Sequence, residues 1–569
     1  MQEFIFGTLA TTEQRLETAR EEKIGVQHQH RLEPRAPRPG QSPLLLVTVE
    51  LDQPVARVEC VVSEPETAVY PLHQHDTQWD LLNWSYYQIW RVALPPQPDG
   101  TLVRYQIVAY PADGSDPILA DDGATFSYFV GDPAQPDWAR EAIVYQIFPD
   151  RFYPGNGRSW QSTQHLSEIY GGSLRGIIDK LDYVADLGFN AIWLNPFFPD
   201  HTHHGYHASD YFSVNPRLGT LDDLKELVAA AHTRGIRLIL DFVANHWGST
   251  HETFQAALAD RHSAYYHWYK WENWPHAYAT FFGVKDLPEV NVQHPDVRAY
   301  LLNSVRYWLG EIGFDGLRLD YVLGPTHDFW TELRAVAKSV RPDVWIFGEA
   351  VETPMTQLSY EGRFDGCLDF LLAQAIRRTF AFGTMDVAAF ATFLDLHEDF
   401  FPDSFSRPSF LDNHDMNRFL WLVGNDRRKL KLAALCQFTL AGAPIVYNGT
   451  EVGVTQERGI TDHNSHGMEE CRQPMLWSED QDQDLLAFYR WLIQLRREHP
   501  VLWRGARQTL HADKLAGTLA YVRYDEQEAI LVGLNASDAA QMIVVTCPRS
   551  GQTYRMTLEP WSGLVTNTG

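Results

Sequence analysis

Four short apolar runs that end in acidic or histidine side chains constrain this chain more than any other feature. They lie at residues 236–246, 313–320, 344–349 and 410–415. Their length and composition are typical of buried strands, and helix-like runs separate them along the chain. Strands that alternate with helices predict a parallel sheet. In a parallel barrel the carboxyl ends of the strands meet at one face, which is where catalytic sites lie.

Arg318 and Asp320 are two residues apart, so on a strand their side chains point to the same face. Burying both groups is unfavourable unless they are paired or functional. One interpretation is a structural ion pair that fixes the strand. The other is a catalytic site, and the carboxylates Glu349 and Asp415 at two other strand ends favour it. Three carboxylates with nearby histidines and an arginine suit glycoside hydrolysis, which needs a nucleophile or base and a proton donor.

The four runs resemble the signature regions of the α-amylase superfamily of glycoside hydrolases, family 13 type. Residues 241–246 (Asp-Phe-Val-Ala-Asn-His) resemble the first region, and residues 313–320 resemble the second. Gly348 and Glu349 resemble the third region, and residues 410–415 (Phe-Leu-Asp-Asn-His-Asp) resemble the fourth. The resemblance covers residues 142–569 most securely. The layout is closest to the neopullulanase, cyclomaltodextrinase and maltogenic amylase branch.

The resemblance implies a role for each of the three carboxylates. Asp320 corresponds to the nucleophile, Glu349 to the general acid and then base, and Asp415 to a residue that grips the sugar ring and favours its distortion. We expect Arg318 to help keep Asp320 ionised. Glu349 needs a raised pKa, for which the apolar run before it supplies a dry setting.

The resemblance also implies several substrate-binding side chains. His246 and His414 correspond to histidines that hydrogen-bond sugar hydroxyls, and Tyr206 corresponds to a tyrosine that stacks on the reacting ring. Asp241 is expected to support the site beside Arg318. For His246, the alternative is a histidine buried in the core.

The expected fold is α/β, with a (β/α)8 TIM barrel at residues 136–495 as its centre. A B domain is expected as an insertion at about 247–294, where the strand–helix alternation stops. Short strand-like runs predict β-sandwich domains at residues 1–135 and 496–569. Within the barrel, Ser173 and Gly188 mark a predicted helix, and residues 220–223 form a predicted capping box.

No cofactor is expected for the chemistry, and a structural calcium stays open. Asn245 occupies the position that ligates calcium in many α-amylases. The branch with N-terminal sandwiches often has another calcium site after the first strand, but the loop at 153–159 lacks most of the expected carboxylates. Calcium takes six to eight oxygen ligands.

Charge and composition limit the classes of partner that this chain can bind. The net charge of −26 argues against binding to nucleic acid or to an anionic membrane surface. Residues 1–10 lack a basic segment, and no apolar stretch approaches ~18 residues, so we expect a cytoplasmic protein with no signal peptide and no membrane span. The expected partner is an α-glucan or maltooligosaccharide, and a homodimer through the N-terminal domain is left open.

The predicted function is therefore a retaining α-glucan hydrolase that acts on maltooligosaccharides, cyclodextrins, starch or pullulan. It would cleave α-1,4 bonds, and α-1,6 bonds stay open. An α-glucosidase or a transglycosylase of the same family is the alternative, and a non-catalytic carbohydrate-binding scaffold is a more remote one. Residues 321–324, directly after Asp320, match no single branch, so the sequence leaves the substrate preference undecided.

Overall fold

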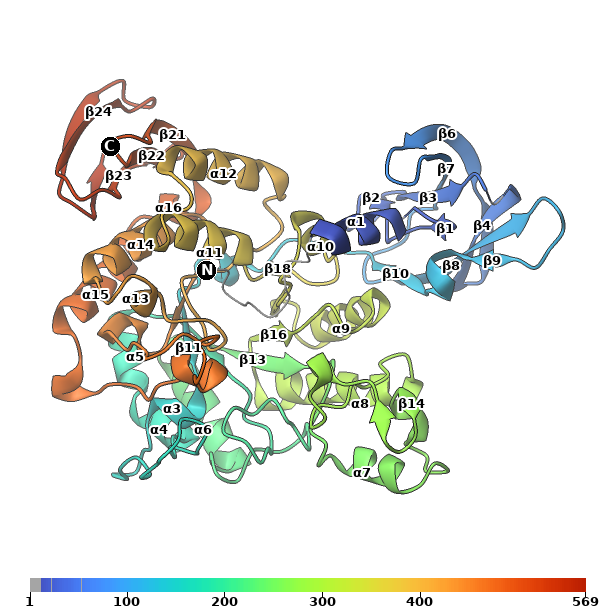
Figure 1. Ribbon diagram of the computed structural model, residues 1–569, viewed down its shortest axis with the longest axis horizontal. Coiled ribbons are helices and arrows are strands. Elements are labelled where there is room, and N and C mark those ends of the chain that lie inside the picture. Colours follow the sequence, from blue (N-terminus) through green and yellow to red (C-terminus); the bar gives the residue numbers. More distant parts are fainter. Residues whose placement is uncertain (1–11, 22, 53, 569) are drawn as a thin grey trace.

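The computed structural model describes residues 12–21, 23–52 and 54–568. Figure 1 shows a central barrel region with antiparallel sheets on either side, formed by the two ends of the chain. The expectation about a signal peptide concerns residues 1–10, which lie outside the described residues. Within the described ranges, no helix combines the length and the apolar character needed to span a bilayer.

An eight-stranded parallel sheet occupies the centre. Its strands in chain order are β11 (Val144–Ile147), β12 (Ala191–Leu194), β13 (Arg237–Val243), β16 (Gly316–Asp320), β17 (Trp345–Gly348), β18 (Gly366–Cys367), β19 (Ser409–Phe410) and β20 (Pro444–Tyr447). Neighbours in the sheet are neighbours in the chain, except that β20 pairs with β11. Two backbone hydrogen bonds connect the segments of the edge strands β18 and β19. Cys367 N–H donates to Ser406 O (3.0 Å), and Asp369 N–H donates to Pro408 O (2.9 Å). The sheet is therefore curled round on itself.

Helices follow the strands, as the alternation predicted. They are α2 (Asp137–Arg140), α3 (Pro149–Phe152), α4 (Leu174–Asp179), α5 (Leu181–Leu187), α6 (Leu221–Thr233), α8 (Pro295–Arg306), α9 (His327–Val340), α10 (Pro354–Leu358), α11 (Phe370–Ile376), α12 (Val387–Phe400), α13 (Phe419–Leu422), α14 (Arg427–Thr439), α15 (Gln483–Glu498) and α16 (Val501–Arg504). The capping box at the start of α6 is confirmed, because Thr220 and Asp223 bond each other's backbone N–H groups.

The single helix predicted from Ser173 to Gly188 is wrong in one respect, because it is split into α4 and α5. Ser173 caps the first helix and Gly188 ends the second in a left-handed conformation, as expected. The break lies at Lys180, whose φ of −112° and ψ of 8° are not helical. Its ammonium group lies 4.3 Å from the ring centres of both Tyr153 and Trp477. These contacts favour the break. They join residues that are distant in sequence, so the spacing of apolar residues along the chain could not predict them.

Two antiparallel sheets form the N-terminal region beside α1 (Thr12–Glu21). One contains β1 (Val26–Gln27), β2 (Leu32–Glu33), β3 (Leu44–Glu50), β6 (His73–Asp80) and β7 (Ser85–Ala93). The other contains β4 (Val55–Glu64), β5 (Ala68–Pro71), β8 (Leu102–Pro111), β9 (Ile118–Leu119) and β10 (Phe126–Phe129). Buried side chains of both sheets, such as Val47 and Ile107, belong to one hydrophobic cluster, so the sheets face each other.

The C-terminal region also has two antiparallel sheets. One contains β21 (Ala506–Asp513), β22 (Thr518–Tyr524), β23 (Ala529–Asn535) and β26 (Ser562–Asn567), and the other contains β24 (Gln541–Thr546) and β25 (Thr553–Leu558). Leu531 of the larger sheet and Ile543 of the smaller one share a buried cluster, so these sheets also pack face to face.

The segment between β13 and α8 departs from the alternation, as predicted. It holds α7 (Glu252–Ala259), the short antiparallel pair β14 (Trp271–Asn273) and β15 (Ala277–Tyr278), and 3₁₀ turns at Tyr266–Trp268 and Phe281–Gly283. Phe281 and Phe282 of the second turn lie at the carboxyl-end face of the curled sheet, where Phe281 stacks on His246.

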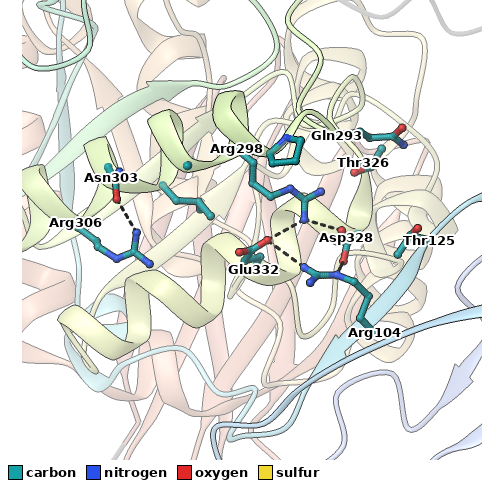
Figure 2. A pocket seen from close by; sticks show the side chains of 12 residues that line it. Arg104, Thr125, Gln293, Arg298, Asn303, Arg306, Thr326, Asp328 and Glu332 are labelled. Carbon is teal, nitrogen blue, oxygen red and sulfur yellow. Dashed lines mark hydrogen bonds and ion pairs between the residues drawn. The ribbon is translucent and has the colours of Figure 1, made fainter. Parts of the chain in front are cut away.

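The N-terminal sheets contact barrel helices through a group of charged side chains shown in Figure 2. Arg104 of β8 pairs with Asp328 (2.9 Å) and Glu332 (3.0 Å) of α9. Arg298 of α8 pairs with the same two carboxylates, at 2.7 and 2.8 Å. Each acidic group is therefore shared between two guanidinium groups, which joins a strand of the N-terminal region to two barrel helices.

Candidate active site

The three carboxylates singled out from the sequence lie together at the carboxyl ends of the parallel strands. Asp320 is the last residue of β16, Glu349 directly follows β17, and Asp415 follows β19 in the chain. All three line one cavity, together with Tyr206 and His246. Asp320 is 7% exposed and Glu349 is 6% exposed, so the groups that face this cavity are otherwise shielded from water.

The guanidinium group of Arg318 contacts the carboxylates of Asp241, Asp320 and Glu349. Its side chain is fully buried, and Nη1 donates to Asp241 Oδ1 (2.8 Å) and Asp320 Oδ1 (2.7 Å). Nη2 lies 2.8 Å from Glu349 Oε2. Arg318, Asp241 and His414 do not line the cavity, so they act on the site through the side chains that do.

Burial raises the pKa of Asp320 well above its usual value, and the charge of Glu349 adds to this effect. Arg318 opposes the rise but does not cancel it. Arg318 therefore favours the ionised form of Asp320, as expected, but burial outweighs its effect. Burial also raises the pKa of Glu349, as expected for a proton donor, with Arg318 again opposing. The dry setting thus acts on both carboxyl groups.

Asp415 has the opposite electrostatic setting. Burial alone would raise its pKa, but His414 and Arg472 outweigh burial and hold the pKa well below the usual range. His414 Nε2 lies 3.0 Å from Asp415 Oδ2, and Arg472 Nη2 donates to Asp415 Oδ1 at 2.8 Å. Asp415 is therefore an ionised carboxylate at the edge of the cavity.

Tyr206 is held by the buried groups. Its hydroxyl group donates to Asp241 Oδ2 (2.9 Å) and lies 2.6 Å from His414 Nε2. The rings of Tyr206 and His414 are parallel, with centres 5.4 Å apart. Gly205 precedes it with a φ of +84°, and a Cβ there would lie 2.2 Å from Pro196 O, so the loop needs glycine at this position. The ring of Tyr206 is thus placed at the cavity wall.

His246 combines both interpretations that the sequence left open. It is 1% exposed, and burial lowers its pKa to about 3, so the imidazole is neutral. It also lines the cavity, and its ring stacks on Phe281 with centres 4.4 Å apart. A neutral ring can both donate and accept a hydrogen bond.

Several side chains at the cavity were not singled out from the sequence. Arg472 is the most important, because it contacts Asp415 directly. Residues 472–477 carry no strand pattern, so the sequence alone does not single it out. The remaining cavity side chains that the sequence analysis did not name are His204, His207, Phe281, Phe282, Val284, Leu287, Tyr321, Met468 and Glu469.

Asn245, which the resemblance relates to calcium, is buried directly before His246. Its amide lies 3.3 Å from His246 Nδ1. The calcium expectation stays a prediction, and no step of the chemistry below is assigned to calcium.

Comparisons with known proteins agree with this geometry. Residues 146–494 match the family model described as alpha amylase, catalytic domain. "Alpha-amylase 2" of Dictyoglomus thermophilum is 36% identical over 510 residues, which are 90% of this chain and 88% of the relative. "Cyclomaltodextrinase" of a Bacillus species is 38% identical over 427 residues, which are 72% of this chain and 75% of the relative.

A solved structure titled "Cyclomaltodextrinase" superimposes with a TM-score of 0.72 at 29% identity, covering 95% of this chain and 99% of that one. The family model covers more than half of the chain, and the agreement with this structure extends through both flanking sheet regions. The chain is thus a glycoside hydrolase that belongs to the α-amylase family.

Proposed function

We propose that this chain is a retaining hydrolase that cleaves α-1,4-glucosidic bonds in maltooligosaccharides, cyclodextrins, starch or pullulan, with α-1,6 bonds as further substrates. The observation that carries the mechanism is the single guanidinium group of Arg318, which contacts both Asp320 and Glu349. Retaining glycosidases hold their two carboxyl groups about 5–5.5 Å apart, whereas inverting enzymes leave about 6.5–9.5 Å for a water. One shared guanidinium group supports the shorter spacing.

In the first step, Asp320 attacks the anomeric carbon and forms a glycosyl ester. Arg318 holds Oδ1, which leaves Oδ2 as the attacking oxygen. Glu349 gives its proton to the glycosidic oxygen as the bond to the leaving sugar breaks. Both contacts of Glu349, from Arg318 and from Tyr321 N–H, go to Oε2, so Oε1 can carry the proton.

In the second step, a water molecule attacks the anomeric carbon while Glu349 takes one of its protons as general base. The ester bond breaks and Asp320 leaves as a carboxylate. Two inversions at the same carbon return it to the α configuration. The proposed mechanism uses only side chains of this chain and assigns no step to a cofactor.

The remaining site residues would hold the sugar ring. Asp415 is kept ionised by Arg472 and His414, so it can accept hydrogen bonds from two ring hydroxyls and favour the distorted ring of the transition state. The neutral imidazole of His246 can bond a third hydroxyl, and the ring of Tyr206 supplies a stacking surface.

We further propose the domain limits 1–135, 136–495 and 496–569, with the insertion at 247–294 acting as a B domain. A homodimer through the N-terminal domain is supported by an aromatic group on β6, β7 and the turn between them. Trp79, Trp84 and Tyr86 are 44%, 73% and 51% exposed, and the ring of Trp79 contacts the other two. Sedimentation of the wild type should show a dimer. The Trp84→Ala dimer should dissociate at a higher protein concentration than the wild-type dimer does. A monomeric wild type would contradict the proposal.

The test of the main proposal is the anomeric form of the first products. Maltotriose, a cyclodextrin and pullulan would each be incubated with the enzyme, and proton NMR would follow the products before mutarotation. We expect the α-anomer first, and initial β-anomer would exclude the retaining mechanism. Chromatography of the same reactions identifies which bonds are cleaved.

A transglycosylase of the same family is the alternative that one observation favours. The cavity wall beside Tyr321 is largely apolar, formed by Phe281, Phe282, Val284 and Leu287. An apolar wall disfavours bound water and suits the face of an acceptor sugar. Products longer than maltotriose in the same chromatograms would identify transfer, and their absence at high substrate concentration would identify hydrolysis.

A further inference from the structure

We propose that Asp200, His201 and His207 bind a divalent transition-metal ion of the Zn²⁺ class, in the loop that follows β12. One ligand atom of each side chain lies within 4.8 Å of the other two. In the described part of the chain, this is the one group of three such side chains that meets this spacing. The site lies beside the cavity, because His207 is one of the cavity-lining residues.

The loop contains four histidines, of which His203 and His204 have partners that hold the loop. His203 Nε2 lies 2.6 Å from Glu469 Oε2, which connects it to the network around Arg472. His204 Nδ1 accepts a hydrogen bond from Tyr206 N–H at 3.1 Å. The ring centre of His207 lies 5.2 Å from that of His201 and 4.9 Å from that of His204. Because His204 Nδ1 is engaged by Tyr206, we take His201 and His207 as the nitrogen ligands.

Asp200 is held in place to serve as the oxygen ligand. Its Oδ2 accepts hydrogen bonds from Thr202 Oγ1 (2.7 Å) and His207 N–H (3.0 Å). Its Oδ1 accepts one from Thr202 N–H (2.6 Å) and lies 3.6 Å from His201 Nδ1. A carboxylate oxygen has two lone pairs, so Oδ1 keeps one on the side of His201.

His207 supplies a second, independent observation. Its Nδ1 is buried and has no hydrogen-bond partner in the described structure. Burial also lowers the pKa of this histidine, which favours the neutral ring that binds metals. A buried polar atom without a partner is unfavourable, and a bound ion would satisfy it.

The donor set selects the kind of ion. Two imidazole nitrogens and one carboxylate suit Zn²⁺ or a similar transition metal, whereas Ca²⁺ prefers six to eight oxygens. Tetrahedral Zn²⁺ with bonds of about 2.1 Å places its donors roughly 3.4 Å apart, so the group must close by about 1 Å. The half-exposed ring of His201 is free to make this movement.

Three protein ligands leave a fourth position open, as in zinc sites that bind a water or a substrate. Tyr206 precedes His207 in the chain and forms part of the same cavity. An ion bound here would therefore fix the loop that carries Tyr206 and change how a glucan binds. We expect Zn²⁺ to alter KM more than kcat.

The test uses the full chain without a histidine tag, treated with a chelator and then titrated with ZnCl₂ in a calorimeter. We expect one equivalent of Zn²⁺, with no competition from a large excess of Ca²⁺. Co²⁺ should bind in its place and give the visible absorption of a tetrahedral N,O site. His201→Gln should weaken Zn²⁺ binding at least tenfold, since removing even an outer-shell partner costs about 10–100-fold.

The matched control is His463→Gln, which removes an exposed histidine from another loop. It should bind Zn²⁺ like the wild type. The proposal fails if His201→Gln keeps the wild-type affinity, if His463→Gln loses as much, or if Ca²⁺ displaces Zn²⁺. A Zn²⁺-dependent KM in the wild type that disappears in His201→Gln would support it, and one that persists would place the ion elsewhere. Circular dichroism of both variants checks that they fold.

Discussion

At the residue scale, Asp320 and Glu349 share one arginine but must carry opposite protonation states when a substrate arrives. Arg318 contacts Oδ1 of the first and Oε2 of the second. Because all three groups are buried, each charge strongly affects the others. The two carboxyl groups therefore titrate as a coupled pair, and their apparent pKa values belong to the pair.

Asp320→Asn should lower kcat on maltotriose by at least about 10⁴-fold, the scale seen when a nucleophile is removed. An amide can keep the hydrogen bond from Arg318, but it cannot form the glycosyl ester. The fold should be unchanged by circular dichroism. Asp222→Asn, an exposed aspartate at the start of α6, is the control and should keep full activity. Retention of more than a few per cent of kcat in Asp320→Asn would show that another group is the nucleophile.

Glu349→Gln should lower turnover of maltooligosaccharides by about 10²–10⁴-fold, the usual contribution of general acid catalysis. Formation of the glycosyl-enzyme from α-glucosyl fluoride should be affected much less, since fluoride leaves with little protonation. Comparable losses on both substrates would point to another acid, and Glu352 would be the first to examine.

The pH profile of wild-type kcat/KM should be bell-shaped, because Asp320 must be ionised and Glu349 protonated. Burial raises both pKa values. A raised pKa of Asp320 moves the acid limb to higher pH, and a raised pKa of Glu349 moves the alkaline limb the same way. We therefore expect both limbs above the range of free carboxyl groups, about 3.9–4.3. In Glu349→Gln, measured with the fluoride, the alkaline limb should disappear, and its persistence would assign it to another group.

The sequence could predict the site residues that end strands, because strand position and residue type together identify them. Asp320, Glu349 and Arg318 were found in this way. Arg472 could not be, since it reaches Asp415 from 57 residues away in a loop without periodic pattern. The pKa of Asp320 also needed the structure, because burial outweighs the adjacent Arg318 only in the folded setting.

At the element scale, continuous buried strands were predicted most closely. The short apolar runs at 191–194 and 444–447 predict strands, and β12 and β20 form there with the same limits, because every residue in them is buried. The run at 366–370 also predicts a strand, but the strand that forms there is shorter and ends at Cys367. Asp369 accepts a hydrogen bond from Leu372 N–H and caps α11, so the apolar residues after it belong to a helix. Capping competes here with the strand pattern.

The 3₁₀ turn Phe281–Gly283 could not be placed from the sequence, because its position depends on contacts with the barrel. Phe281 stacks on His246, and both aromatic side chains of the turn pack against Tyr321, at 4.9 and 5.4 Å. Phe282 is 51% exposed and lines the cavity. We therefore expect Phe282 to contact a bound sugar beyond the reacting bond.

Phe282→Ala should raise KM for maltooligosaccharides about 2–10-fold and leave kcat nearly unchanged. An aromatic contact is worth ~0.5–1.5 kcal/mol, and one made equally in the ground and transition states acts on KM alone. Steady-state kinetics on maltotriose and maltohexaose would measure the change. Phe382→Ala, which removes a phenylalanine that is 36% exposed outside the cavity, is the control and should not alter KM. An unchanged KM in Phe282→Ala would remove this contact from the binding site.

At the scale of the whole molecule, two kinds of contact stand out among those that join the N-terminal sheets to the barrel. One is the charged group of Figure 2, in which Arg104 and Arg298 share Asp328 and Glu332. The other is a stack of rings. The ring centre of His30, in the turn between β1 and β2, lies 4.1 Å from that of His327 at the start of α9. The ring centre of His327 lies 4.5 Å from that of Tyr360.

The histidines of this contact are buried in their neutral form. Burial lowers the pKa of His30 and His327 well below 6.5, and the charge of Arg363 adds to the effect in both. His28, close to His30, has a pKa of about 3 because burial outweighs its bond with Leu46 O. The charged groups that act on these rings are Arg31 and Arg363, both cations. The carboxylate of Asp121 lies beside them, but it accepts hydrogen bonds from the backbone N–H groups of His28 and Gln29.

This arrangement predicts that the protein loses stability in mild acid. Below about pH 6.5 the unfolded chain binds protons at these histidines while the folded chain does not, so the free energy of unfolding falls as the pH falls. The contribution is complete above pH 6.5 and decreases down to the folded pKa, about 3 for His28. Each buried histidine would remove up to about 2 kcal/mol at pH 5.

Urea unfolding of the wild type, His30→Gln and His327→Gln between pH 5 and 7.5 measures this effect. Each variant removes one titrating ring, so its stability should fall less steeply with decreasing pH than that of the wild type, whatever its stability at pH 7.5. The exposed His276→Gln is the control and should keep the wild-type slope. If both His30→Gln and His327→Gln keep the wild-type slope, these histidines do not cause the acid sensitivity. The carboxylates shared by Arg104 and Arg298 would be the next to replace, because protonating them would break the charged contact.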